Sequence, residues 1–148
     1  MLSGWMDIAM EEAAAAGARG EIPVGAVISK DGRLVARAGN RTREQNDPTA
    51  HAEILVIREA CRALENERLT DCDLTVTLEP CAMCAAAISF ARIRRLYYAA
   101  SDPKGGAVEN GTRFYSSAAC HHRPEVYSGI QEIRANELLT EFFKKLRN

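Results

Sequence analysis

The chain lacks the long apolar segments that mark exported and membrane proteins. Its first ten residues include Asp7 and contain neither a positively charged leader nor an extended apolar run. We therefore expect no signal peptide and no membrane span. Internal repeats, low-complexity tracts and linkers are also absent. These absences predict a cytoplasmic protein that does not use a membrane as a partner.

A disulfide framework is also missing. The chain has five cysteines, an odd number, and without a secretion signal this count favours metal binding or buried thiols. A length of 148 residues with 47% hydrophobic content is enough for one ordinary core without disulfides. We therefore expect a single domain over residues 1–148.

A strong excess of charge of one sign is absent as well. The chain has 19 basic and 20 acidic residues, and its formal net charge is −1. This balance excludes a surface that is basic throughout, as in proteins that bind nucleic acid nonspecifically. Any contact with RNA must therefore depend on local positive charge.

What the chain does have is an alternation of helical and strand patterns. We expect helices over 5–18, 49–64, 81–91 and 136–146, and strands over 24–29, 34–39, 74–78, 94–100 and 126–130. Lys30-Asp31-Gly32 joins the first two strands as a hairpin, and Thr49 is the expected cap of the second helix. The order predicts an α/β fold of three layers, α/β/α, with a mixed, mostly parallel central sheet and helices on both faces.

Two short motifs at successive strand-to-helix junctions carry metal-binding chemistry. His51-Ala52-Glu53 and Pro80-Cys81-Ala82-Met83-Cys84 together form the pattern of zinc-dependent nucleobase deaminases. A catalytic zinc takes three protein ligands in a tetrahedron and leaves the fourth position for water. His51, Cys81 and Cys84 supply that number, and cysteines three apart share one face of a helix. We predict one Zn²⁺ per chain.

Glu53 is better suited to move protons than to bind the metal. It lies two residues from His51, so on a regular helix the two side chains diverge. Zinc would lower the pKa of its bound water to about 7, and Glu53 would take the proton. The resulting hydroxide would attack the carbon that bears the exocyclic amine, and Glu53 would return protons to the ring nitrogen and the departing ammonia.

A structural zinc is the alternative interpretation, but it requires a fourth protein ligand. The only other histidines, His121 and His122, lie in a polar loop and are expected at a surface or an interface. The remaining thiols lack metal-binding spacing and are expected to be packed or idle; they are Cys61, Cys72 and Cys120.

Longer stretches of the chain resemble the bacterial tRNA-specific adenosine deaminases. The resemblance runs nearly end to end and is carried by 46–53, 77–84, 20–27, 101–104, 122–123 and 142–145. It implies a homodimer of cytidine-deaminase-like fold that acts on a tRNA anticodon stem-loop. The implied reaction converts the wobble adenosine to inosine by attack at C6.

The resemblance also implies roles for residues outside the metal site. Asn40 would read the base, Ile28 and Leu78 would be apolar pocket walls, and Asp102 and Lys104 would lie on a loop that meets the RNA backbone. Phe143 would help to hold a flanking nucleotide, whereas Phe142 is expected to pack in the core. Lys144, Lys145 and Arg147 would supply local positive charge for RNA, or else form an ordinary solvated helix end.

Two other functions fit the same motifs. A deaminase of free bases or nucleosides, acting on guanine or cytosine, would use the same zinc ligands and glutamate on the same fold. A noncatalytic RNA-binding subunit stabilised by zinc is the second. Glu53 argues against it, because a structural zinc site has no use for a free carboxylate beside the metal.

Overall fold

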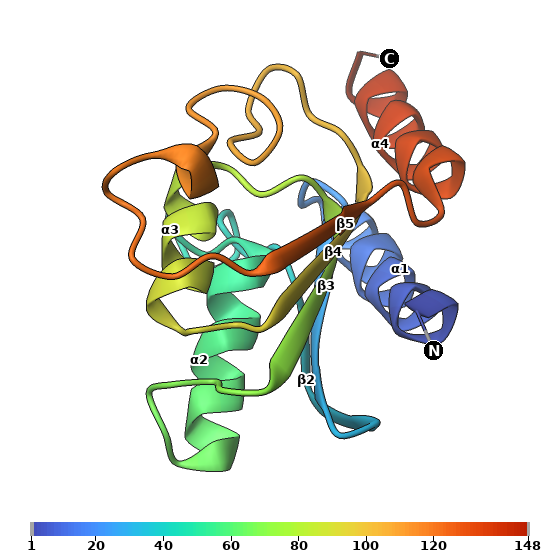
Figure 1. Ribbon diagram of the computed structural model, residues 1–148. Helices are drawn as coiled ribbons and strands as arrows, with labels where there is room; N and C mark the ends of the chain where they lie inside the picture. The colour runs from blue at the N-terminus through green and yellow to red at the C-terminus, as the bar shows by residue number, and fades with distance from the viewer. Residues whose placement is uncertain (1, 148) are drawn as a thin grey trace.

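Helices and strands alternate along residues 2–147, which the computed structural model describes (Figure 1). The elements are α1 (Leu2–Ala18), β1 (Gly25–Lys30), β2 (Arg33–Gly39), α2 (Ala52–Leu64), β3 (Cys72–Leu78), α3 (Ala82–Phe90), β4 (Arg95–Ala100), the 3₁₀ turn η1 (Phe114–Ser116), β5 (Glu125–Ser128) and α4 (Glu132–Arg147). Within this range, none of the helices combines the length and the apolar character that crossing a membrane requires.

The five strands form one mixed sheet in the order β2-β1-β3-β4-β5. β1 pairs antiparallel with both β2 and β3, whereas β3, β4 and β5 pair in parallel. Four strands therefore point in one direction and β1 alone opposes them, which confirms the mixed, mostly parallel sheet. The predicted hairpin is present: Lys30 pairs with Arg33, and Asp31 and Gly32 both have positive φ.

Helices cover both faces of the sheet, as the three-layer prediction requires. α1 and α4 pack on one face, and α2 and α3 lie on the other (Figure 1). Val56, Leu74 and Ile88 are fully buried between the sheet and the α2–α3 layer. Met6, Met10 and Ala135 are buried in the core on the α1–α4 side. Burial of these side chains on both faces is the main stabilising contribution to the fold.

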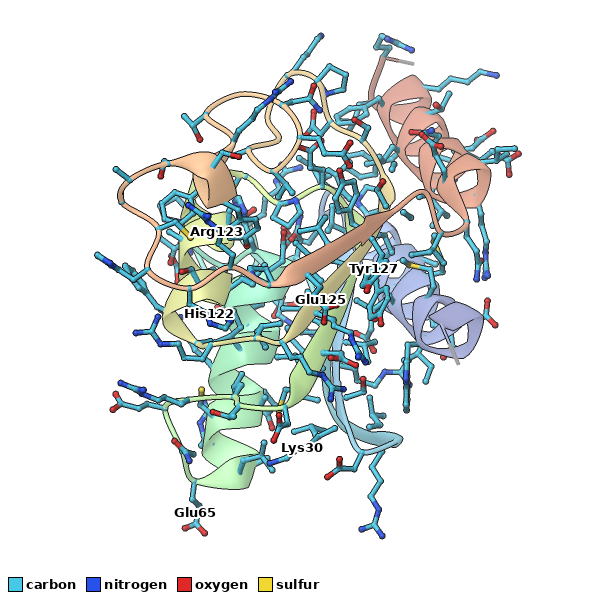
Figure 2. All side chains as sticks on the ribbon, viewed as in Figure 1. Lys30, Glu65, His122, Arg123, Glu125 and Tyr127 are labelled. Carbon is cyan, nitrogen blue, oxygen red and sulfur yellow. The ribbon has the colours of Figure 1, made fainter. Side chains whose placement is uncertain are left out.

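One edge of the sheet collects the segments that carry the predicted motifs. β2, β3 and β4 all end there, and the chain segments that follow them lead into residues 40–51, 79–81 and 101–113. α2 and α3 begin at this edge. Lys30 and Glu65, labelled in Figure 2, lie at the opposite end of the molecule. The carboxyl edge of such a sheet is where α/β folds place their sites.

Several helix and strand boundaries differ from the prediction. α2 begins at Ala52 with His51 as its N-cap, and Thr49 does not cap it. The reason is local: Asp47 Oδ1 accepts hydrogen bonds from the Thr49 amide at 2.8 Å and the Thr49 hydroxyl at 2.7 Å, which forms a turn before the helix.

The other shifts also follow from local conformation. Cys81 is the N-cap of α3, so this helix starts one residue later than expected. β5 ends at Ser128 because Gly129 adopts a positive φ of 81°. α4 then starts at Glu132, four residues before the predicted start.

Candidate metal centre and catalytic pocket

His51, Cys81 and Cys84 converge at the start of α2 and α3. Their ligand atoms lie within 4.8 Å of one another. His51 Nδ1 is 3.6 Å from the Cys81 sulfur and 3.5 Å from the Cys84 sulfur, so Nδ1 is the nitrogen that faces both. Among residues 2–147, no other His, Cys, Asp or Glu joins this group as a fourth ligand. Three donors of this kind suit a zinc site with one open position.

The helix starts explain why these side chains point at one another. His51 and Cys81 are N-caps with extended backbone, and neither side chain is used to cap its own helix. Both side chains are therefore free to turn toward the shared point. The positive ends of two helix dipoles meet there and favour anionic thiolates.

The three donors also shift one another's protonation. Hydrogen bonds from the Cys84 thiol and from His51 lower the pKa of the Cys81 thiol, because they stabilise its thiolate. The hydrogen bond to Cys81 in turn raises the pKa of His51. The hydrogen bond to Cys81, together with burial, raises the pKa of the Cys84 thiol, so the negative charge that favours a cation lies on the Cys81 sulfur.

Glu53 lies beside this cluster on the first turn of α2. Its side chain is only 4% exposed, and this burial raises the pKa of its carboxyl to about 7. A carboxyl with a pKa near neutrality can both accept and release protons under working conditions. It is not among the three residues whose ligand atoms could hold a metal ion together.

A pocket of about 230 Å³ opens directly onto this group. His51, Glu53 and Cys81 are among the residues that line it. The other residues that line it are Ile22, Val24, Asn40, Leu78, Glu79, Asp102 and Gly105. The structure therefore brings three further predicted site residues to the metal centre: Asn40, Leu78 and Asp102.

Asn40 is held firmly at the pocket wall. Its Oδ1 accepts a hydrogen bond from the Ala52 amide at 2.8 Å, so this side chain caps α2 in place of His51. The backbone N–H of Asn40 donates a hydrogen bond to the carbonyl of Val24. Among the described residues no partner is found for Asn40 Nδ2. One N–H₂ donor therefore remains available beside the pocket.

Ile28, which was predicted as an apolar wall, is not among the residues that line this pocket. Its side chain is fully buried within β1 in the core on the α2–α3 side. Ile22 and Val24, which precede β1, line the pocket instead. β1 runs opposite to the other strands, so its beginning, not its interior, reaches the carboxyl edge.

The predicted RNA-contacting residues lie farther out. Lys104 is exposed in the turn after Asp102, whose Oδ1 accepts the Lys104 and Gly105 amides. Phe143 is 42% exposed, and Lys144, Lys145 and Arg147 are exposed along the last turns of α4. Phe142 is half-buried and packs edge-on against Phe143, at 5.5 Å between ring centroids.

α4 borders a groove that is separate from the catalytic pocket. Phe142 and Lys145 line a groove of about 230 Å³ with the end of α1 and Pro23. Pro23 stands between Ile22 and Val24, which line the catalytic pocket. The groove and the pocket thus lie on either side of one short segment. Phe143 and Arg147 do not line either hollow.

The remaining histidines and thiols lie apart from the pocket. His122 is half-buried, and its Nε2 lies 2.7 Å from the Ile93 carbonyl; Figure 2 shows it on the segment that leads to β5. His121 is exposed. Cys72 is buried in the core, and Cys61 and Cys120 are partly buried against it. None of the three belongs to the metal-binding group.

One buried acid was not anticipated from the sequence. Glu79 is 2% exposed and lines the pocket through the start of the β3–α3 junction. Burial tends to raise its pKa, but hydrogen bonds from Asp102, Asn110 and other loop groups outweigh this effect and lower it. Its position in the sequence, directly before Pro80 and Cys81, could have indicated that it lies beside the metal-binding group.

Comparisons with known proteins agree with this geometry. Residues 2–100 match the model of the cytidine and deoxycytidylate deaminase zinc-binding region. The tRNA-specific adenosine deaminase of Agrobacterium fabrum is 64% identical over 97% of this chain and 94% of its own length. The chain belongs to the family of the tRNA-specific adenosine deaminases.

Solved structures extend the comparison to the fold. A structure from biochemical and structural studies of A-to-I editing by tRNA:A34 deaminases superposes with a TM-score of 0.91 at 65% identity, covering 92% of this chain and 99% of that one. A guanine deaminase from Bacillus subtilis superposes with a TM-score of 0.67 at 33% identity, covering 98% and 93%. The cytidine-deaminase-like fold is therefore confirmed, and zinc is the cofactor of this family's site.

Proposed function

We propose that this protein hydrolytically deaminates adenosine to inosine at the wobble position of a tRNA anticodon. The observation that carries the proposal is the three-ligand centre that opens onto a pocket beside a buried glutamate. The relatives that match the chain over nearly its full length are tRNA-specific adenosine deaminases. We further propose that residues 1–148 form one deaminase domain.

The residues at the centre fit a catalytic zinc. We assign His51 Nδ1 and the sulfurs of Cys81 and Cys84 as its ligands, because one imidazole and two thiolates leave a tetrahedral position open. Zinc held by these residues would supply a water of lowered pKa. The Glu53 carboxylate would accept a proton from water and pass protons to the purine ring nitrogen and to the leaving amine.

The pocket wall explains how a purine is held. Ile22, Val24 and Leu78 offer apolar surface to the faces of a base. The free N–H₂ donor of Asn40 faces acceptor atoms on the base edge. A flipped nucleotide is read in this way, by stacking on apolar groups and by hydrogen bonds to its edge.

The RNA backbone binds to residues outside the pocket. We assign this contact to Lys104 on the rim loop and to Lys145 and Arg147 on α4, with Phe143 beside a flanking nucleotide. Lys145 supports the assignment because it lines the groove that Pro23 separates from the pocket. Exposed cations beside aromatic rings suit single-stranded loops of RNA.

We also propose a homodimer, formed through the outer face of α3. This helix contains no charged residue, yet one of its faces is open to solvent. The residues of that face are Ala82, Met83, Ala86, Ala87 and Phe90, and Phe90 is 70% exposed. A helix that is apolar all round is normally covered, and a second copy offers the same apolar face. Light scattering should give twice the chain mass, and Phe90→Glu should give a monomer.

A cytoplasmic location follows from the same proposal. The substrate is tRNA, and Cys81 and Cys84 must remain reduced to bind zinc, which a reducing compartment ensures.

One experiment separates this function from salvage of free bases. The purified protein is incubated with an anticodon stem-loop that carries adenosine at the wobble position, with the same stem-loop carrying guanosine, and with guanine, cytosine and adenosine. Chromatography of the nuclease digest should show inosine from the first substrate alone. Release of ammonia from guanine or cytosine, with the stem-loop untouched, would replace the proposal by the free-base deaminase.

A further inference from the structure

The most heavily hydrogen-bonded side chain beside the pocket is Glu79. Its carboxylate accepts six hydrogen bonds from one loop. Oε1 accepts from the Asp102 amide at 2.9 Å, the Asn110 side-chain amide at 2.7 Å and the Ser101 hydroxyl at 3.3 Å. Oε2 accepts from the backbone amides of Val108, Glu109 and Asn110 at 3.0, 2.9 and 3.1 Å. All six partners are donors, so the position requires a group that only accepts.

The loop held in this way forms one wall of the pocket. Asp102 and Gly105 line the pocket, and the Asp102 backbone is bonded directly to Glu79. Asp102 Oδ1 accepts the Gly105 amide at 3.0 Å, and the Asp102 carbonyl accepts the Gly106 amide at 2.9 Å. The hydrogen bonds between Glu79 and Asp102, and between Asp102 and the residues after it, therefore fix the position of this wall.

Close packing makes the contact specific. A Cβ atom added at Gly106 would lie 2.4 Å from Glu79 Cδ and 2.6 Å from the Asp102 carbonyl oxygen. No side chain larger than hydrogen fits there without moving the loop or the carboxylate. Glycine at this position thus lets the backbone close around Glu79.

We propose that Glu79 is a positioning residue that joins the β3–α3 junction, where Cys81 and Cys84 lie, to the loop that forms the substrate wall. Glu79 does not touch the reacting atoms. It sets the place of Asp102 and Gly105 relative to the metal ligands, and thereby the fit of the substrate. This inference rests on the proposed function, since it concerns the substrate of the same pocket.

A second buried carboxylate provides a matched control. Glu21 is 1% exposed and accepts the Arg43 and Glu44 amides at 3.1 and 2.9 Å and the Thr42 hydroxyl at 3.3 Å. It holds a loop as Glu79 does, but these three loop residues do not line the pocket. Asn40 is held separately, by its bonds to Val24 and Ala52.

The test is Glu79→Gln beside Glu21→Gln. In Glu79→Gln, the new N–H₂ group should occupy the Oε1 position, because the three backbone amides at Oε2 cannot turn whereas the Ser101 hydroxyl can. The Asp102 amide and the Asn110 side-chain N–H₂ then both lose this acceptor. An unpaired buried donor is costly, so the pocket wall should shift.

We expect Glu79→Gln to raise KM for the stem-loop about tenfold while kcat changes by less than about threefold. Zinc content should stay near one per chain, and the visible spectrum of the cobalt-substituted protein should match the wild type. The main-chain bond from the Glu79 amide to the Ala100 carbonyl is kept, so the ligand strand stays in place. Glu21→Gln should lose thermal stability to a similar extent and keep the wild-type KM.

Three results would overturn the proposal: an unchanged KM in Glu79→Gln, loss of zinc in that variant, or an equal rise of KM in Glu21→Gln. If Glu79→Gln does not fold, Gly106→Ala tests the same contact and should raise KM in the same way. Should the wild type deaminate only guanine, the proposed function fails, and the same comparison made with guanine still decides the role of Glu79.

Discussion

The floor of the pocket, meaning the metal ligands and Glu53, is held in the protein in a different way from the C-terminal helix α4. Cys84 and Glu53 are buried, and each lies on the first turn of a helix that starts at the carboxyl edge of the sheet. α4 packs through an inner side that includes Ala135 and Leu138, whereas Phe143 and Leu146 remain 42% and 60% exposed.

This difference predicts two kinds of response to mutation. At the floor, each metal ligand or proton-carrying group occupies a position that no other residue can fill. Removal of one such group should therefore abolish zinc binding or proton transfer completely. On α4, charge acts through water and over distance, so each substitution should change RNA affinity by a graded and salt-dependent amount. Four experiments test the contrast, from the largest expected effect to the smallest.

Loss of a metal ligand should have the largest effect. Cys84→Ala should lower zinc from about one per chain to near zero and abolish deamination, because two ligands do not hold the ion. Elemental analysis measures this. Cys61→Ala removes a partly buried thiol outside the site and should retain zinc and activity. Full zinc content in Cys84→Ala would contradict the ligand assignment.

Loss of the proton carrier should abolish turnover but leave the metal. Glu53→Gln should reduce kcat by about 100-fold or more, the usual contribution of a general acid–base group. Zinc content and stem-loop affinity should be unchanged. Glu59→Gln, an exposed glutamate on the same helix, is the control. Single-turnover rates within about tenfold of wild type would remove Glu53 from the mechanism.

The Asn40 side chain has one acceptor that caps α2 and one free donor beside the pocket, and two substitutions separate these two functions. Asn40→Asp keeps an acceptor for the Ala52 amide but removes the N–H₂ donor, so kcat/KM should fall about tenfold or more while thermal stability is retained. Asn40→Ala should lose both, with about 1 kcal/mol of stability from the missing cap. Equal stability losses in the two variants would show that capping is not its structural role.

Charge reversal on α4 should give the smallest and most graded effect. Lys145→Glu with Arg147→Glu should weaken stem-loop binding and reduce the slope of log affinity against log salt by about 1.4 units, since each of the two lost phosphate contacts removes about 0.7. Zinc content should not change. Lys30→Glu with Arg33→Glu makes the same charge change at the far end of β1 and should leave the slope unaltered. Identical slopes in both double variants would place α4 outside the RNA surface.

Motif spacing predicted the metal-binding group because its members lie at or near the starts of helices that follow strands. Residues 51–53 and 80–84 each follow a strand that runs in the common direction, so both segments arrive at one edge. Pattern also predicted the order of the elements and the hairpin. It misplaced the start of α2, because the Asp47 turn competes with a Thr49 cap, a choice between two similar local hydrogen bonds.

The pocket wall was harder to predict, because it depends on which end of each strand reaches the site. Ile28 and Val24 belong to the same apolar run, and only the reversed direction of β1 decides that Val24 lines the pocket and Ile28 the core. Alternation of apolar residues says which side chains are buried. It does not say at which end of the sheet they lie.

By itself, the sequence determined the donor set proposed for zinc and the glutamate proposed to carry protons, since these depend on residue type and on spacings of two to four positions. Only the tertiary structure decided that Asn40 caps α2, that Glu79 holds the loop from Ser101 to Asn110, and that Pro23 separates the pocket from the groove beneath α4. The physical reason is how far apart in the sequence the contacting residues lie. Those contacts join residues far apart in the chain, and their geometry is set by how the strands pair and how the helices pack on the sheet.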